Sequence, residues 1–282
     1  MYDVHVKNNI AQVGLDRLKF ENYQITENLN KASVIILRSY NLHGIEIPET
    51  VEVIGRAGAG VNNIPVEKMS ERGVPVFNTP GANANAVKEL TIAALLIAAR
   101  NICDARDYVQ SLDANENNLK KLIENGKKQF AGIELPGRTL GVIGLGSIGV
   151  NVANAALALG MKVIGFDPKV TVENAWKLSS GVQQVESLKE IFEISDAVTV
   201  HVPLVEETEN LIDINNLDLL KKNSVLINFS REGIVNSKDV VRALNNNILK
   251  NYVCDFPEPI LMENKKVIAL PHLGASTFEA EE

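Results

Sequence analysis

The segment that most constrains the fold is TLGVIGLGSIGVNVANAALALGMKVIGFD, residues 139–167. An apolar run of strand length leads into three glycines, Gly144, Gly146 and Gly149, and apolar residues then recur at helical spacing. In such a unit the first glycine permits a tight turn and the second lets the main chain approach a pyrophosphate. The third allows the helix to pack closely on the strand. The segment predicts a dinucleotide-binding unit, and a glycine-rich turn without a ligand is the disfavoured alternative.

Asp167 ends the next apolar run, MKVIGFD. A carboxylate at this point accepts hydrogen bonds from the adenine ribose hydroxyls and repels a 2′-phosphate. The beginning of the intervening helix offers unpaired N–H groups to the phosphates. The sequence therefore predicts NAD, not NADP, as the cofactor.

Strand-like and helix-like segments alternate along the chain, and its 282 residues suggest about two domains. A first series has strands at 33–37, 51–54 and 74–77, and a helix is expected from about 85 to 110. After a polar connector at 113–138, six more strands are expected: TLGVIG, MKVIGFD, AVTVHV, SVLINFS, YVCDF and KVIAL. Wholly apolar strands separated by helices predict an α/β fold with a doubly wound parallel sheet.

Composition excludes several classes of protein. The net charge of −7, without a basic tail, argues against nucleic acid as the main partner. The apolar run at 90–99 is half of the roughly 20 residues that a membrane span needs, so we expect a buried helix and no membrane association. Cys103 and Cys254 are too far apart to suggest a disulfide framework or a metal site, which favours the cytoplasm.

Polar residues follow the strands of the second series, namely His201, Arg231, Asp255, Glu258 and His272. In open parallel sheets ligands bind beyond the carboxyl ends of the strands. Hydride transfer from an alcohol requires a base for the hydroxyl proton, a cation for a substrate carboxylate and a carboxylate to orient the base. Each residue alone is compatible with an ordinary surface or capping role, but together they predict an oxidoreductase that acts on a hydroxy acid.

The motifs SREGIV, CDFPEP and LPHLGAST, together with GLGSIG and with residues 56–90, resemble the D-isomer-specific 2-hydroxyacid dehydrogenases over essentially the whole chain. The resemblance is strongest to members that act on 3-phospho-D-glycerate. It implies NAD-dependent oxidation to 3-phosphohydroxypyruvate, the first step of L-serine biosynthesis, in a homodimer or higher homo-oligomer.

The same resemblance implies two domains. Residues 1–84, completed by 276–282 and by residues beyond this chain, would form a flavodoxin-like substrate-binding domain. Residues 85–275 would form a Rossmann NAD-binding domain. The pattern S-x-x-E at Ser276 predicts the start of a helix there.

By resemblance, Arg231 binds the substrate carboxylate and His272 is the general acid/base. The glutamate that partners this histidine often lies about five residues after the aspartate, where this chain has Ile260. Glu258, two residues earlier and also followed by proline, is the candidate, and Glu263 is a weaker one.

The remaining site residues are also carried over from the family. The cofactor-binding set is Gly144, Gly146, Ser147, Ile148, Gly149, Asp167, Pro203, Ser230, Arg231, Asp255, His272, Gly274 and Ala275. The substrate-binding set is Arg38, Ser39, Gly58, Ala59 and Gly60.

Two alternatives stay open at this point. The substrate could be another D-2-hydroxy acid, such as glycerate or lactate. The chain could also be a non-catalytic NAD(H)-sensing protein of the corepressor kind, which would bind NADH tightly with negligible turnover.

Overall fold

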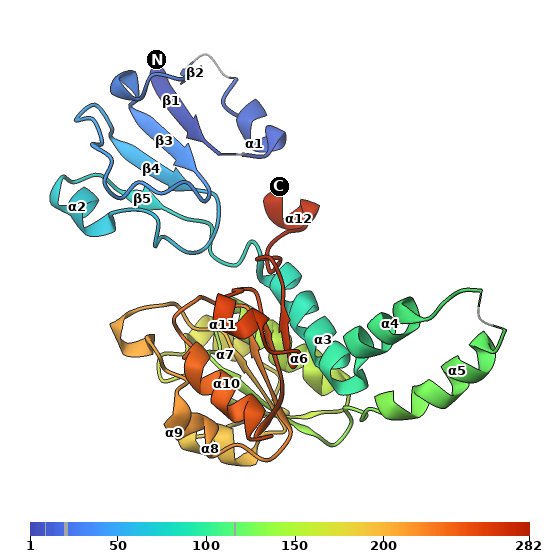
Figure 1. Ribbon diagram of the computed structural model, residues 1–282. Helices are drawn as coiled ribbons and strands as arrows, with labels where there is room; N and C mark the ends of the chain where they lie inside the picture. The colour runs from blue at the N-terminus through green and yellow to red at the C-terminus, as the bar shows by residue number, and fades with distance from the viewer. Residues whose placement is uncertain (9, 20–21, 116) are drawn as a thin grey trace. The chain divides into compact units, whose positions relative to one another are not determined.

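A computed structural model describes residues 1–8, 10–19, 22–115 and 117–282. The chain divides into two compact units, Met1–Ala86 with Ala275–Glu282 and Val87–Gly274. Each unit is built on a parallel sheet with helices around it (Figure 1). The predicted α/β fold class is thereby confirmed.

The described part of the first unit has a five-stranded sheet in the order β2-β1-β3-β4-β5. Its strands are β1 (Tyr2–Lys7), β2 (Tyr23–Thr26), β3 (Val34–Leu37), β4 (Val53–Arg56) and β5 (Val76–Phe77). Its helices are α1 (Gln12–Asp16), η1 (Leu29–Lys31), α2 (Val66–Glu71) and α12 (Phe278–Glu281). The order 2-1-3-4-5 is that of flavodoxin-like sheets. The core of this unit lies around Ile35, Leu37, Ile54 and Met69, which are fully buried.

The second unit has a seven-stranded sheet among its described residues, in the order β8-β7-β6-β9-β10-β11-β12. The strands are β6 (Thr139–Ile143), β7 (Lys162–Phe166), β8 (Val182–Gln184), β9 (Ala197–Val200), β10 (Ser224–Asn228), β11 (Leu249–Cys254) and β12 (Val267–Ala269). Counted along the chain, the order begins 3-2-1-4-5-6, which is the dinucleotide-binding arrangement.

Helices cover both faces of this sheet (Figure 1). The helices of this unit are α3 (Ala84–Arg100), α4 (Ile102–Ser111), α5 (Leu119–Gly126), η2 (Lys127–Phe130), α6 (Ser147–Ala158), α7 (Val172–Lys177), α8 (Leu188–Ile194), η3 (Glu206–Thr208), α9 (Ile214–Leu217), α10 (Ser237–Asn245) and α11 (Pro259–Met262). Of these, α4 and α5 extend away from the sheet (Figure 1). Neighbouring residues of β10 show why the centre of this strand is apolar. Ile227 packs into one buried cluster and Leu226 into the other, so both faces of the strand are covered.

Four expectations about individual elements were wrong. The first unit has two strands, β1 and β2, that the sequence analysis did not include. The helix expected over 85–110 is two helices, α3 and α4, because Asn101 between them has φ +52, a left-handed conformation that breaks helix geometry and that Asn tolerates. The sheet of the second unit has one strand more than expected, β8, whose sequence is only VQQ. The last helix begins after Thr277 rather than Ser276, since Thr277 Oγ1 accepts the Ala280 N–H at 3.1 Å.

Across the described ranges, α3 and every other helix falls short of the length and apolar character that a membrane crossing requires.

Candidate functional site

The glycine-rich turn joins β6 to α6, and its three glycines have different surroundings. A Cβ on Gly144, which has φ +90, would lie 2.6 Å from the His201 carbonyl oxygen, and one on Gly149 would lie 1.9 Å from the Gly144 carbonyl oxygen. A Cβ on Gly146 would meet no atom within 4 Å. Packing therefore requires two of the glycines, whereas the middle one leaves an open cradle at the start of α6, where N–H groups can bind a phosphate.

Asp167 lies directly after β7 and is tied to this turn. Its Oδ2 accepts the Leu145 N–H at 2.8 Å, and its Oδ1 accepts the Lys169 N–H at 2.8 Å. Ser147 is the first residue of α6, and Ile148 packs against the core below it. The cradle and the carboxylate fit the pyrophosphate and the ribose of a dinucleotide.

Substitution can separate the packing role of Gly149 from the phosphate-binding role of Gly146. We expect Gly146→Ala to raise the NADH dissociation constant about tenfold or more, roughly 1.4 kcal/mol, because the methyl group fills the cradle while φ −72 suits alanine. We expect Gly149→Ala to lower the free energy of unfolding by about 1–3 kcal/mol through overpacking. Fluorescence titration and urea denaturation measure the two quantities. Equal NADH affinity in wild type and Gly146→Ala would show that the pyrophosphate does not bind at this turn.

Ser230 and Arg231 lie in the loop after β10, and Asn228 at the end of that strand fixes the loop. Asn228 Oδ1 accepts the Ser230 N–H at 3.0 Å, and its Nδ2 donates to the Arg231 carbonyl oxygen at 2.9 Å. Ser230 Oγ donates to the Val202 carbonyl oxygen at 2.5 Å, which links the loop to the end of β9 just before Pro203. Asn228 was not among the predicted site residues, although its position at a strand end was the available signal.

The Arg231 side chain is half-buried beside its own loop. Its Nη1 donates to the Ser230 carbonyl oxygen at 2.6 Å. Burial lowers the pKa of this guanidinium, which nonetheless stays protonated at neutral pH. The arrangement leaves a cation whose other N–H donors can take a carboxylate.

Asp255 and His272 meet at the ends of β11 and β12. Asp255 is 1% exposed, and its carboxylate accepts the Leu273 N–H at 3.0 Å and the Gly274 N–H at 2.7 Å. Burial raises the pKa of Asp255, and the two N–H groups and the charge of His272 oppose that rise. The carboxylate thus fastens the main chain directly after His272.

His272 itself is exposed and has φ +56. A residue other than glycine in this region stores about 1–3 kcal/mol of strain, which the surrounding contacts must offset. The Asp255 carboxylate supplies two of those contacts, and the Phe256 ring meets the imidazole edge-on with centroids 5.4 Å apart. The ring is therefore presented outward at the carboxyl end of the sheet.

Glu258 makes a different set of contacts. It precedes α11, and its Oε1 accepts a hydrogen bond from Ser237 Oγ on α10. Glu263, the weaker candidate, is exposed at the end of the same helix. Glu258 is thus hydrogen-bonded to Ser237, whereas the carboxylate hydrogen-bonded to the loop after His272 is that of Asp255.

His201 also follows a strand of this sheet, but it has the properties of a structural residue. Its Nε2 lies 3.0 Å from Thr199 Oγ1, and desolvation by burial lowers the pKa of the imidazole to about 3. A ring that stays neutral through the physiological range is poorly suited to proton transfer at neutral pH.

In the first unit, the predicted substrate residues lie after β3 and β4. Arg56 Nε and Asn63 Nδ2 each donate to the Arg38 carbonyl oxygen at 3.1 Å, so the main chain at Arg38 and Ser39 is held in place. Gly58 has φ +141, and a Cβ there would lie 1.9 Å from Arg56 Nη1. The turn needs glycine because φ +141 is a conformation that residues with a side chain rarely adopt.

Two residues that sequence reasoning did not single out support the Gly58–Ala59–Gly60 turn. Thr79 Oγ1 accepts the Gly58 N–H at 2.7 Å, and Asn78 Nδ2 donates to the Ala59 carbonyl oxygen at 2.6 Å. The signal for them was their place directly after β5, in the run NTP.

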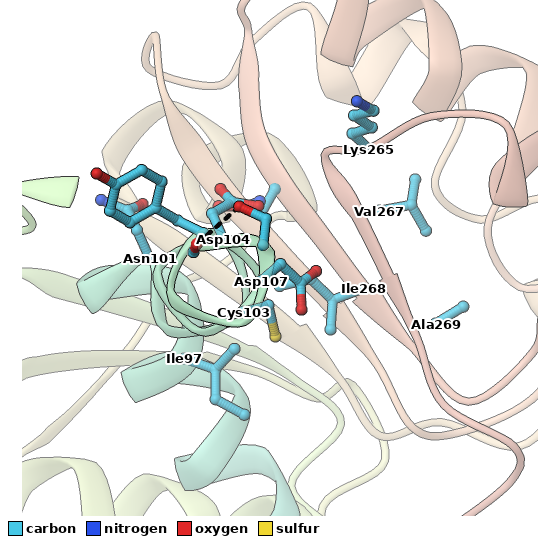
Figure 2. A pocket seen from close by; sticks show the side chains of 12 residues that line it. Ile97, Asn101, Cys103, Asp104, Asp107, Lys265, Val267, Ile268 and Ala269 are labelled. Carbon is cyan, nitrogen blue, oxygen red and sulfur yellow. Dashed lines mark hydrogen bonds between the residues drawn. The ribbon is translucent and has the colours of Figure 1, made fainter. Parts of the chain in front are cut away.

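A separate pocket of about 590 Å³ lies between α4 and the edge strand β12 of the second unit. Figure 2 shows Asp104 and Asp107 on α4 together with Cys103, with Lys265 across from them. Burial raises the pKa of the Cys103 thiol, and the two carboxylates add to that rise. The residues that line this pocket do not include any of the predicted site residues.

Comparisons with known proteins match this architecture. Residues 92–274 match the model of the D-isomer specific 2-hydroxyacid dehydrogenase, NAD binding domain. D-3-phosphoglycerate dehydrogenase from Methanocaldococcus jannaschii is 39% identical over 92% of this chain and 48% of its own length. The enzyme of that name from Synechocystis is 35% identical over 100% of the chain and 52% of its own length. The chain thus spans about half the length of these relatives.

A solved structure, NAD⁺-bound 3-phosphoglycerate dehydrogenase from Entamoeba histolytica, superposes with a TM-score of 0.78. It is 25% identical and covers 99% of this chain and 90% of its own.

Proposed function

The chain belongs to the D-isomer specific 2-hydroxyacid dehydrogenase family, and from this premise we propose that it oxidises 3-phospho-D-glycerate to 3-phosphohydroxypyruvate with NAD. The observation that carries the proposal is the 35–39% identity to proteins named D-3-phosphoglycerate dehydrogenase over most of the chain. This reaction would place the protein at the entry to L-serine biosynthesis. Cytoplasmic location and assembly as a homodimer or higher homo-oligomer stay predictions.

The chain's own residues would divide the work as follows. When bound, NAD would supply the acceptor for the hydride on C2 of the substrate. His272 removes the proton from the C2 hydroxyl group, and Arg231 binds the substrate carboxylate. Asp255 keeps the His272 loop in its strained conformation through the Leu273 and Gly274 N–H groups.

The proposal assigns a binding role to residues of each unit, taken by itself. The turn of Gly144, Gly146 and Gly149, with Asp167, would bind the dinucleotide. Arg38, with the turn at Gly58, would bind the phosphate of the substrate, since a guanidinium is suited to phosphate oxygens. The first unit would thus be the substrate-binding domain.

The test is reduction of 3-phosphohydroxypyruvate by NADH, run beside hydroxypyruvate and pyruvate. We expect kcat/KM to be at least about tenfold higher for the phosphorylated acid, equivalent to about 1.4 kcal/mol, because only that acid has a phosphate that Arg38 can bind. NADPH should be a poorer reductant than NADH because of Asp167. If only the unphosphorylated acids are reduced, the substrate is another 2-hydroxy acid and not 3-phospho-D-glycerate. Tight NADH binding without any turnover would favour the NAD(H)-sensing alternative.

A further inference from the structure

The Arg38 side chain is paired with an acidic residue of its own unit. Arg38 Nη1 lies 2.9 Å from Oε1 of Glu281 on α12. The two residues are far apart in the sequence but belong to the same compact unit. The guanidinium proposed to bind the substrate phosphate is therefore already engaged by a carboxylate.

The side chain of Arg38 is the part of this residue that can respond to a ligand. Its main chain is held by the hydrogen bonds from Arg56 and Asn63 to the carbonyl oxygen. The side chains of Arg38 and Glu281 are 29% and 43% exposed, so solvent reaches the pair. Such a pair is weak, and an incoming anion can compete for it.

We propose that Glu281 sets the affinity for phosphorylated substrate by competing with the substrate phosphate for Arg38. A phosphate monoester carries about −1.5 to −2 charges near pH 7. The phosphate must either displace the Glu281 carboxylate or bind beside it against charge repulsion. Both routes weaken binding of the phosphorylated acid, and neither affects an acid that lacks the phosphate. This inference rests on the proposed role of Arg38 in phosphate binding.

Kinetics of Glu281→Gln test the inference in the purified protein. We expect KM for 3-phosphohydroxypyruvate to fall about two- to fivefold, the range set by partly exposed ion pairs. We expect kcat and the KM for hydroxypyruvate to stay unchanged, since catalysis and the carboxylate site are not altered. Glu279→Gln is the matched control, because it removes the same charge from the same helix, and it should leave both KM values unchanged.

A double-mutant cycle shows whether Glu281 acts through Arg38. In an Arg38→Ala background, Glu281→Gln should no longer change KM for the phosphorylated acid. A fall in KM for both acids, or an equal fall in the Arg38→Ala background, would overturn the inference.

Binding of inorganic phosphate separates this inference from the proposed function. If the wild type does not reduce 3-phosphohydroxypyruvate, the proposed function fails, and the phosphate dissociation constants of wild type and Glu281→Gln still decide the role of Glu281. Tighter phosphate binding by the variant supports that role. Phosphate affinity that is equal in the two proteins, or undetectable in both, contradicts it.

Discussion

Replacing His272 with asparagine should lower kcat about 10²- to 10⁴-fold, the usual contribution of a general acid/base. Asparagine cannot take the hydroxyl proton, but it tolerates the left-handed backbone better than alanine does. The main chain at φ +56 and the hydrogen bonds to Asp255 should therefore persist. NADH affinity should stay within about twofold, because the glycine turn and Asp167 are not altered.

Stopped-flow kinetics and NADH fluorescence titration measure these two quantities. His43→Asn serves as the control, since His43 is an exposed histidine of the first unit that bonds the Asn62 carbonyl oxygen, and it should leave kcat unchanged. Wild-type turnover in His272→Asn would show that another group transfers the proton. A loss of NADH binding of the same size as the loss of kcat would instead point to a collapsed loop.

The sequence predicted those parts of the fold that depend on short-range pattern. Strands such as β10 are apolar on both faces because helices cover both faces, so composition alone revealed them. β1, β2 and β8 were missed because polar residues interrupt their apolar pattern, and what makes them strands is pairing with neighbours distant in sequence. The break at Asn101 depends on contacts to Phe130 and Ala131, which no local pattern contains.

The candidate site divides in the same way. The glycine turn could be predicted because the spacing of its glycines lies within one strand-turn-helix unit, in which Gly149 packs on Gly144. The contact of Gly144 with His201, which is distant in sequence, could not be predicted in this way. The hydrogen bond of Glu258 joins it to Ser237, 21 residues away, and Asp255 binds an N–H group 18 residues away. Spacing along the chain predicts which residues lie at the end of a strand. The direction of their side chains depends on hydrogen-bond partners that are distant in sequence.

Arg231→Gln should lower kcat/KM for the 2-oxo acid about 30-fold or more. This corresponds to a loss of about 2–5 kcal/mol of transition-state binding. Glutamine lacks the charge and the forked donors that a carboxylate requires. The loop itself should survive, because Asn228 bonds its main chain at Ser230 and Arg231. NADH affinity should therefore change little.

The lysine variant shows what the guanidinium contributes beyond its charge. Arg231→Lys restores the charge without the fork and should recover only part of the loss, whereas Arg242→Gln, a change at an exposed position on α10, should have no effect. Steady-state kinetics with 3-phosphohydroxypyruvate and with hydroxypyruvate should show equal losses for Arg231→Gln, because both acids carry the carboxylate. A loss confined to the phosphorylated acid would place Arg231 at the phosphate and reverse the roles proposed for Arg231 and Arg38.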